Sequence, residues 1–250
     1  MAVFLGGCGI VGTSRDAAVP EVSERMAVAR ANQEVGDFVE AARLYELELE
    51  ANPGSAPALA GLGETLTASG QFNRAEQVLS AASLLHPRDV SLLLARVELE
   101  LSRKSPRVAL SFFDQVLARD RWNLRGILGR GVSLDYLSLH NDAQVAYLAG
   151  LSRYPSHFGL QNNYGLSLIL SNDIDRGLGL LEDLFRTPDR GEAVRVNLAL
   201  GYYLSDRRDD ARALLDDVMG RDQIEREISR FEEIQKNFRS GDPIGYLVFN

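Results

Sequence analysis

Residues 59–87 read LAGLGETLTASGQFNRAEQVLSAASLLHP, and this stretch decides the fold. Its first half carries apolar residues at helical spacing, among them Leu62 and Leu66. Its second half repeats that spacing with Ala75 and Leu79. A glycine separates the two halves and a proline ends the stretch, both of which are typical of turns. The stretch therefore predicts two short helices joined by a tight turn.

The same pattern returns every 34 residues along most of the chain. A large apolar residue follows four positions after each of six small residues, which are Ala41, Ala75, Ala109, Ala143, Gly177 and Ala211. Helices this short bury their apolar faces only by stacking on neighbouring copies. The period therefore predicts one elongated stack of six helix pairs from Val22 to Glu225.

The spacing resembles the tetratricopeptide repeat, whose pattern is W-x2-L-G-x2-Y, A-x3-F, P. This resemblance implies an all-α, right-handed superhelical solenoid of about six helix pairs over residues 22–225. Residues 226–250 are expected to form a capping helix and an apolar tail, the helix running over Asp222–Arg239 with one apolar side. The tail, from Gly241 to Asn250, is expected to fold back on the cap; a role in binding a partner is the alternative.

Composition and motifs argue against several function classes. The chain of 250 residues has a formal net charge of −8, which disfavours nucleic acid as a partner. The three histidines, His86, His140 and His157, lie at expected turns and lack metal-ligand spacing. Phosphate-binding loops and nucleophile motifs are absent from the sequence. We therefore expect no catalytic residues, metal, cofactor or small-molecule substrate.

The amino-terminal residues resemble a bacterial lipoprotein signal. Leu5-Gly6-Gly7-Cys8 is similar to the lipobox, which ends in an acylated cysteine, and Cys8 is the sole cysteine of the sequence. The resemblance implies a truncated signal over residues 1–7, lipidation of Cys8, and a flexible tether over residues 8–21. It also implies a place on the periplasmic face of the outer membrane. The alternative is a disordered cytoplasmic terminus, because neither a basic region nor a full apolar region precedes Gly7.

The repeat register also predicts a binding groove. Stacked helix pairs curl so that the first helix of each pair lines a concave wall. The residues expected to bind a partner there are Arg30, Glu64, Glu98, Arg125, Asn162, Asn163, Asn197 and Tyr203. Asp135, Leu166 and Leu200 are expected on the same wall.

The asparagines of that wall allow two interpretations. Asn163 and Asn197 lie 34 residues apart and could form a ladder that binds the backbone of an extended peptide. In the alternative interpretation they satisfy neighbouring helix ends.

Two runs carry a closer resemblance. Residues Asn162–Leu170, NNYGLSLIL, and Arg195–Tyr202, RVNLALGY, are similar to runs of TadD-like proteins of tight-adherence (Flp, type IVc) pilus systems. Asn172 and Asp206 stand where that family usually has a turn glycine. The resemblance implies an adaptor that helps assemble or localise the pilus secretin. A lipid-anchored scaffold for another envelope complex is the alternative.

Replacing Cys8 with serine tests the lipidation hypothesis. We expect Cys8→Ser to abolish labelling by a radioactive fatty acid and to release the protein from membranes, because serine lacks the thiol that is acylated. The unsubstituted chain, expressed with the same amino terminus, is the control. Labelling or membrane association that persists in the variant would refute the lipoprotein interpretation.

Overall fold

The computed structural model describes residues 21–187 and 191–248. These residues form helices, turns and loops, and no strand occurs among them. None of their helices is long and apolar enough to cross a bilayer.

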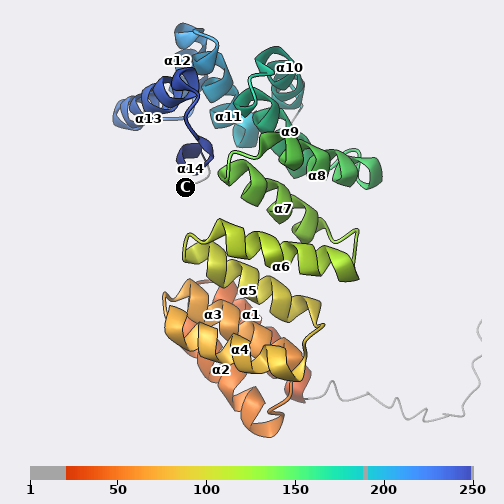
Figure 1. The fold of residues 1–250 in the computed structure, drawn as a ribbon. Coiled ribbons are helices and arrows are strands. Elements are labelled where there is room, and N and C mark those ends of the chain that lie inside the picture. Colours follow the sequence, from red (N-terminus) through yellow and green to blue (C-terminus); the bar gives the residue numbers. More distant parts are fainter. Residues whose placement is uncertain (1–20, 188–190, 249–250) are drawn as a thin grey trace, which may run out of the picture.

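Twelve of the helices form six antiparallel pairs that stack in chain order, as Figure 1 shows. The pairs are α1 (Glu21–Glu34) with α2 (Phe38–Ala51), α3 (Ala56–Ala68) with α4 (Phe72–Leu85), α5 (Val90–Ser102) with α6 (Pro106–Arg119), α7 (Leu124–Tyr136) with α8 (His140–Arg153), α9 (Phe158–Leu170) with α10 (Ile174–Phe185), and α11 (Gly191–Leu204) with α12 (Arg208–Asp216). The expected solenoid of six helix pairs is confirmed.

The ends of the helices recur at the same interval of 34 residues. Four of the first helices begin after a side chain that accepts a backbone N–H from the first turn, and these capping residues are Ser55, Asp89, Asn123 and His157. After each first helix one residue adopts a left-handed conformation, which reverses the chain. These positions are Gly36, Gly70, Lys104, Ser138, Asn172 and Asp206.

Close approach of the two helices within a pair depends on a small residue in the first helix. A Cβ atom added to Gly63 would lie 2.4 Å from Cδ2 of Leu79, and one added to Gly131 would lie 2.2 Å from the ring of Tyr147. Leu79 and Tyr147 are both fully buried. The large residue of the second helix therefore fills the space that the missing side chain leaves.

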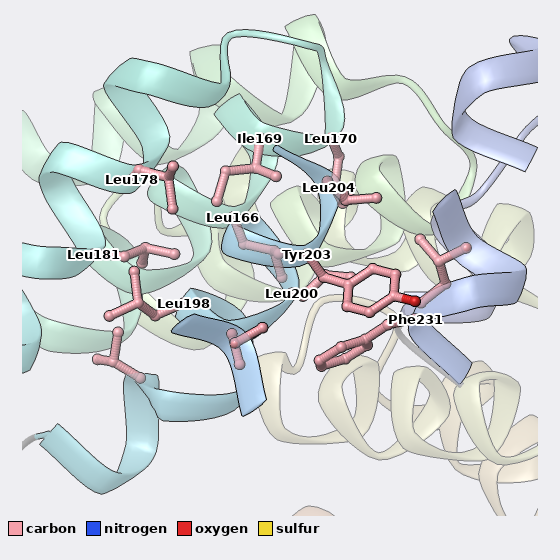
Figure 2. Packing of buried hydrophobic residues seen from close by; sticks show 14 of the residues in the cluster. Leu166, Ile169, Leu170, Leu178, Leu181, Leu198, Leu200, Tyr203, Leu204 and Phe231 are labelled. Carbon is pink, nitrogen blue, oxygen red and sulfur yellow. The ribbon is translucent and has the colours of Figure 1, made fainter. Parts of the chain in front are cut away.

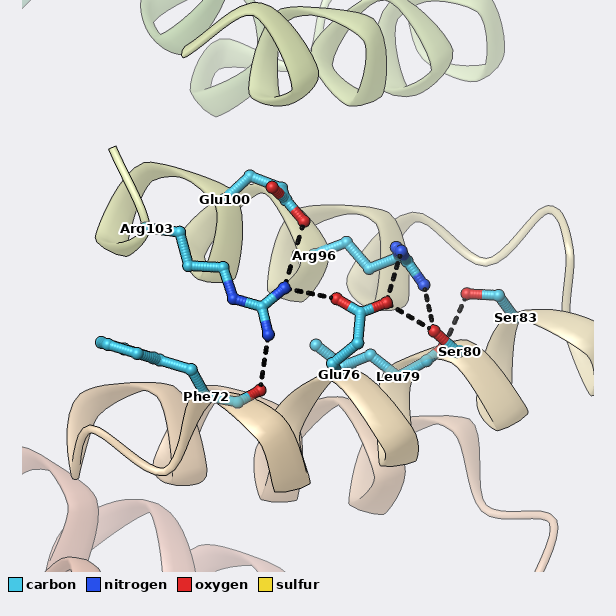
Figure 3. A network of polar contacts seen from close by, with 8 residues as sticks. All are labelled: Phe72, Glu76, Leu79, Ser80, Ser83, Arg96, Glu100 and Arg103. Carbon is cyan, nitrogen blue, oxygen red and sulfur yellow. Dashed lines mark hydrogen bonds and ion pairs between the residues drawn. The ribbon is translucent and has the colours of Figure 1, made fainter. Parts of the chain in front are cut away.

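Polar contacts join neighbouring pairs where the apolar core ends. Figure 3 shows Glu76 of α4 between two arginines of α5, at 3.2 Å from Arg96 and 2.8 Å from Arg103. The Ser80 hydroxyl donates to Glu76 and, together with both arginines, lowers the pKa of that carboxyl. Arg103 also donates to the Phe72 carbonyl oxygen. This network links the second pair to the third.

A long helix, α13 (Arg221–Ser240), covers the end of the stack. Its Phe231 packs against Tyr203 of α11 with ring centroids 5.7 Å apart, and Figure 2 shows both rings beside Leu200. Ile224 and Ile234 are buried in the same core cluster. The capping helix matches the expected range Asp222–Arg239, but the expected division between repeats and cap at residues 225 and 226 is wrong, because it falls inside α13.

The last described segment runs from α13 back to the fourth pair. It ends in a short helix, α14 (Gly245–Val248), which lies near the end of α7 in Figure 1. Gly245 donates its N–H to Ser138 Oγ at 3.2 Å, while Arg230 of α13 donates to the Leu247 carbonyl oxygen. The tail thus contacts the cap, as expected, and also reaches α7, which the sequence analysis did not predict.

The turn after α3 gives a direct test of the left-handed positions. Gly70 has φ of +76° and open space around the place of a Cβ atom. We expect Gly70→Ala to lower the free energy of unfolding by about 1 kcal/mol, through backbone strain alone, as measured by urea denaturation. Gly54→Ala is the matched control, since Gly54 has equally open space but no positive φ. Equal stability of the two variants would contradict this account.

Candidate binding groove

A groove lies on the first helices of the amino-terminal half. Its volume is about 590 Å³, and its lining residues come from α1 to α3 and the start of α5. They include Arg30 and Gln33 from α1, Ala60 and Glu64 from α3, and Ser91 from α5. The groove therefore spans three successive pairs, as the repeat register predicts for the concave wall.

Charged side chains from successive pairs lie in this groove and beside it. We call Arg30, Glu64, Glu98 and Arg125 the groove cluster. Arg125 of α7 forms ion pairs with Glu98 of α5 and with Glu64 of α3, the latter at 3.7 Å. Arg30 of α1 lines the same groove as Glu64, and its positive charge acts on the Glu64 carboxylate. The structure thus brings together four of the residues predicted to bind a partner.

The environment of Glu64 differs from that of an ordinary surface carboxylate. Burial raises the pKa of Glu64, the negative charge of Glu98 adds to this shift, and Arg125 opposes it. Exposed ion pairs contribute little to stability, and the side chains of Arg125 and Glu98 are 48% and 42% exposed. The cluster is therefore better suited to contacts with a partner than to holding the solenoid together.

The three asparagines lie farther along the first helices and bond to one another. Asn197 of α11 donates to Asn162 of α9 at 3.1 Å, and Asn162 donates to Asn163 at 3.2 Å. Asn162 thus lies between Asn163 and Asn197 in this chain of hydrogen bonds, and the binding of a peptide backbone by the asparagines stays a prediction. Their side-chain bonds go to each other rather than to helix ends, which contradicts the alternative interpretation. All three are half-buried.

Tyr203 is not part of an open groove, and its assignment there is wrong. Its side chain is 2% exposed because Phe231 of α13 packs against it. Leu166 and Leu200 are likewise buried in the core cluster that α13 joins. The repeat register predicts these three residues on the wall, but all three belong to the buried core cluster that also contains Phe231 of α13.

Cys8, the predicted lipidation site, lies outside the described residues, as do the truncated signal at 1–7 and most of the tether at 8–21. Within the described ranges, histidines and carboxylates form no group of three or more that could hold a metal ion.

Comparison with known proteins identifies the repeat. A sequence model of the tetratricopeptide repeat family matches residues 33–97, and no curated protein matches the chain. A tetratricopeptide repeat protein from Parabacteroides merdae ATCC 43184 is similar in structure, with a TM-score of 0.69, 16% identity, and coverage of 79% of this chain and 78% of that one. The fold is a tetratricopeptide-repeat solenoid.

Two other solved tetratricopeptide-repeat proteins are similar in structure. PilW, a widely conserved type IV pilus biogenesis factor, has a TM-score of 0.67 at 14% identity, covering 80% of this chain and 94% of its own. YrrB, a tetratricopeptide-repeat protein with an unusual peptide-binding site, has a TM-score of 0.51 at 16% identity, covering 63% of this chain and 81% of its own. At such identities the likeness establishes the fold alone.

The sequence analysis missed a buried polar network in the fourth repeat. Asp135 of α7 is fully buried rather than exposed on the groove wall. Its carboxylate contacts His140 Nδ1 at 2.8 Å and accepts hydrogen bonds from Ser167 Oγ at 2.7 Å and Tyr147 Oη at 3.0 Å. Burial raises the pKa of Asp135, although the hydrogen bonds from His140 and Ser167 oppose the shift. The network ties α7, α8 and α9 together.

The other two histidines occupy the turns that the sequence analysis predicted. His86 ends α4 and contacts the Gly54 carbonyl oxygen through Nε2 at 2.7 Å. His157 caps the start of α9 by accepting the Leu160 N–H. His140 was predicted in the turn between the two helices, but it is the first residue of α8 and directly follows that turn. Its contact with Asp135 was not predicted, because the partner lies on the preceding helix.

Substitution of Asp135 tests this network. We expect Asp135→Ala to lower the free energy of unfolding by about 3 kcal/mol, because three buried polar groups lose their partner. Asp135→Asn keeps an acceptor oxygen and should lower the free energy of unfolding by less.

Comparison of the unsubstituted protein with Asp135→Asn also tests how stability depends on pH. Because the pKa of Asp135 is raised on folding, its protonated form favours the folded state. The stability of the unsubstituted protein relative to Asp135→Asn should therefore fall as pH rises from the ordinary pKa of 3.8 through the raised value. Urea denaturation at several pH values measures this difference, and a constant difference would contradict the shift.

Proposed function

We propose that this protein is a non-catalytic adaptor that binds an extended segment of a partner protein in the groove along α1, α3, α5 and α7. The observation that carries the proposal is the groove cluster. Arg30 and Glu64 line one hollow, and Arg125 forms ion pairs with Glu64 and Glu98, so that both signs of charge from four successive repeats lie close together. An extended peptide can contact such a row one repeat at a time.

The charges of the groove favour a polar partner segment over an apolar one. Arg30 and Arg125 lie at its two ends, and Glu64 and Glu98 lie between them in repeat order. A segment with basic side chains at its centre and acidic ones at its ends would complement this order. In complexes, Glu64 and Glu98 would exchange Arg125 for a partner cation.

We further propose that the adaptor is an acylated protein of the bacterial outer membrane that helps assemble or localise the secretin of a tight-adherence pilus system. Two observations support this: the lipobox-like residues Leu5–Cys8, and the TadD-like runs at Asn162–Leu170 and Arg195–Tyr202. A neighbour of the same fold, PilW, is itself a type IV pilus biogenesis factor. A scaffold for another envelope complex is the competing proposal.

A crosslinked pull-down from membranes tests both proposals. We expect the double variant Glu64→Lys with Glu98→Lys to lose the main partner, because two central charges of the groove are reversed. The control is Glu46→Lys with Glu50→Lys, which changes net charge equally on the exposed surface of α2. Mass spectrometry of the captured proteins is the measurement.

The two proposals fail in different ways in that experiment. If the groove variant and the control capture the same proteins, the groove is not the binding site. If the groove variant loses a partner and neither the secretin nor another pilus component is among the proteins lost, the pilus assignment is wrong and the competing scaffold is favoured.

A further inference from the structure

A C-terminal segment of the chain lies at the turns that join the two helices of the last three repeats. Residues 241–248 leave α13 at Gly241, which has φ of +75°, and pass to the end of α7. Ile244 is 3% exposed, and Gly245 is also buried. The segment therefore sits in a site rather than along an open surface.

Two residues of this site, Ser138 and Asn172, adopt left-handed backbone conformations. The first two repeats have glycine at this turn position, whereas repeats three to six have Lys104, Ser138, Asn172 and Asp206. A residue with a Cβ atom is strained in the left-handed backbone conformation, whereas glycine is not. Strain of this kind persists only where the surrounding structure compensates for it.

Two of these side chains lie at the C-terminal segment. Ser138 Oγ accepts the Gly245 N–H, whereas Asp206 accepts two hydrogen bonds from Arg239 of α13, at 2.5 and 2.7 Å. Asn172 lines a hollow whose wall also includes Ile244. We call this region, with Ser138, Asn172 and the end of α7, the tail site.

The tail site selects its occupant by shape. A Cβ atom on Gly245 would lie 1.9 Å from the Asp135 carbonyl oxygen and 2.5 Å from that of Tyr136, so only glycine fits. The aliphatic side chain of Ile244 is buried just before it, and Leu247 packs against the same core cluster after it. The site therefore accepts an aliphatic residue, then glycine, then an aliphatic residue two or three positions later.

The tail fills this site incompletely, and hydrogen bonds with Ser138 and Arg230 join it to the rest of the structure. A hollow of about 580 Å³ remains beside it, lined by Ser138, His140 and Asn172 and by the exposed residues Asp242 and Pro243 of the tail. Terminal segments open locally at a lower free-energy cost than the core. Tyr246 is 44% exposed, which leaves an aromatic ring at the rim.

We propose that the tail site binds a partner segment with this aliphatic–glycine pattern, and that residues 242–248 are an internal competitor that occupies it when no partner is present. The inference goes beyond the proposed function, because the tail site and the groove cluster are different surfaces. A tethered segment acts at an effective concentration in the millimolar range, so it would block weak ligands and yield to stronger ones.

A peptide of residues 241–248, GDPIGYLV, carrying a fluorophore is the probe for this site. We expect the full-length variant Gly245→Ala to bind it at least tenfold more tightly than the unsubstituted chain, because the added Cβ expels the internal tail. Gly179→Ala is the matched control, since its Cβ would meet open space. A probe that itself carries alanine for Gly245 should bind at least tenfold more weakly to Gly245→Ala. Fluorescence anisotropy gives these affinities.

A second variant keeps the test decisive if Gly245→Ala unfolds. A chain that ends at Gly241 removes the competitor outright, and circular dichroism checks that it is folded. We expect it to bind the probe, and to bind about fivefold more weakly when Ser138→Gly removes the acceptor of the glycine N–H. Equal binding of the probe to the unsubstituted chain and to the folded variants would overturn the proposal, as would no binding to either variant. Exchange of tails between two copies, seen as a dimer in light scattering, would also overturn it.

Discussion

The close approach of two helices within each repeat is the constraint on which the rest of the structure depends. Gly63 leaves room for Leu79, and Gly131 leaves room for Tyr147. Because the second helix packs this closely, its large residue becomes part of a buried core that neither helix could form alone. The period of 34 residues follows, since every copy must return the chain to the same packing geometry.

A stack built this way has two open ends and a continuous wall of first helices. The C-terminal end is closed by α13, whose Phe231 packs on Tyr203. Leu200 and Tyr203 of α11 are buried in the core cluster to which α13 contributes Phe231. The charged groove cluster lies on the first helices of earlier repeats, outside that core cluster, and Arg125 and Glu98 remain exposed.

Polar residues inside the stack have two kinds of role. Asp135 is buried with partners from two other helices, so it fixes how the fourth and fifth repeats meet. Glu76 joins the second and third repeats at a partly exposed edge. The groove cluster also bridges repeats, but Arg125 and Glu98 remain well exposed and can exchange partners. Burial decides which of these networks is structural.

The sequence by itself determined the helix pairs, their turns and the direction of the wall, because these depend on local spacing that repeats every 34 residues. It therefore predicted that Glu64, Glu98 and Arg125 share one face. Only the tertiary structure decided which members of that face stay open, since α13 covers Tyr203 from outside the repeat and Asp135 turns inward to partners on α8 and α9. The docking of Gly245 against α7 joins residues 107 positions apart, and no local pattern encodes such a contact.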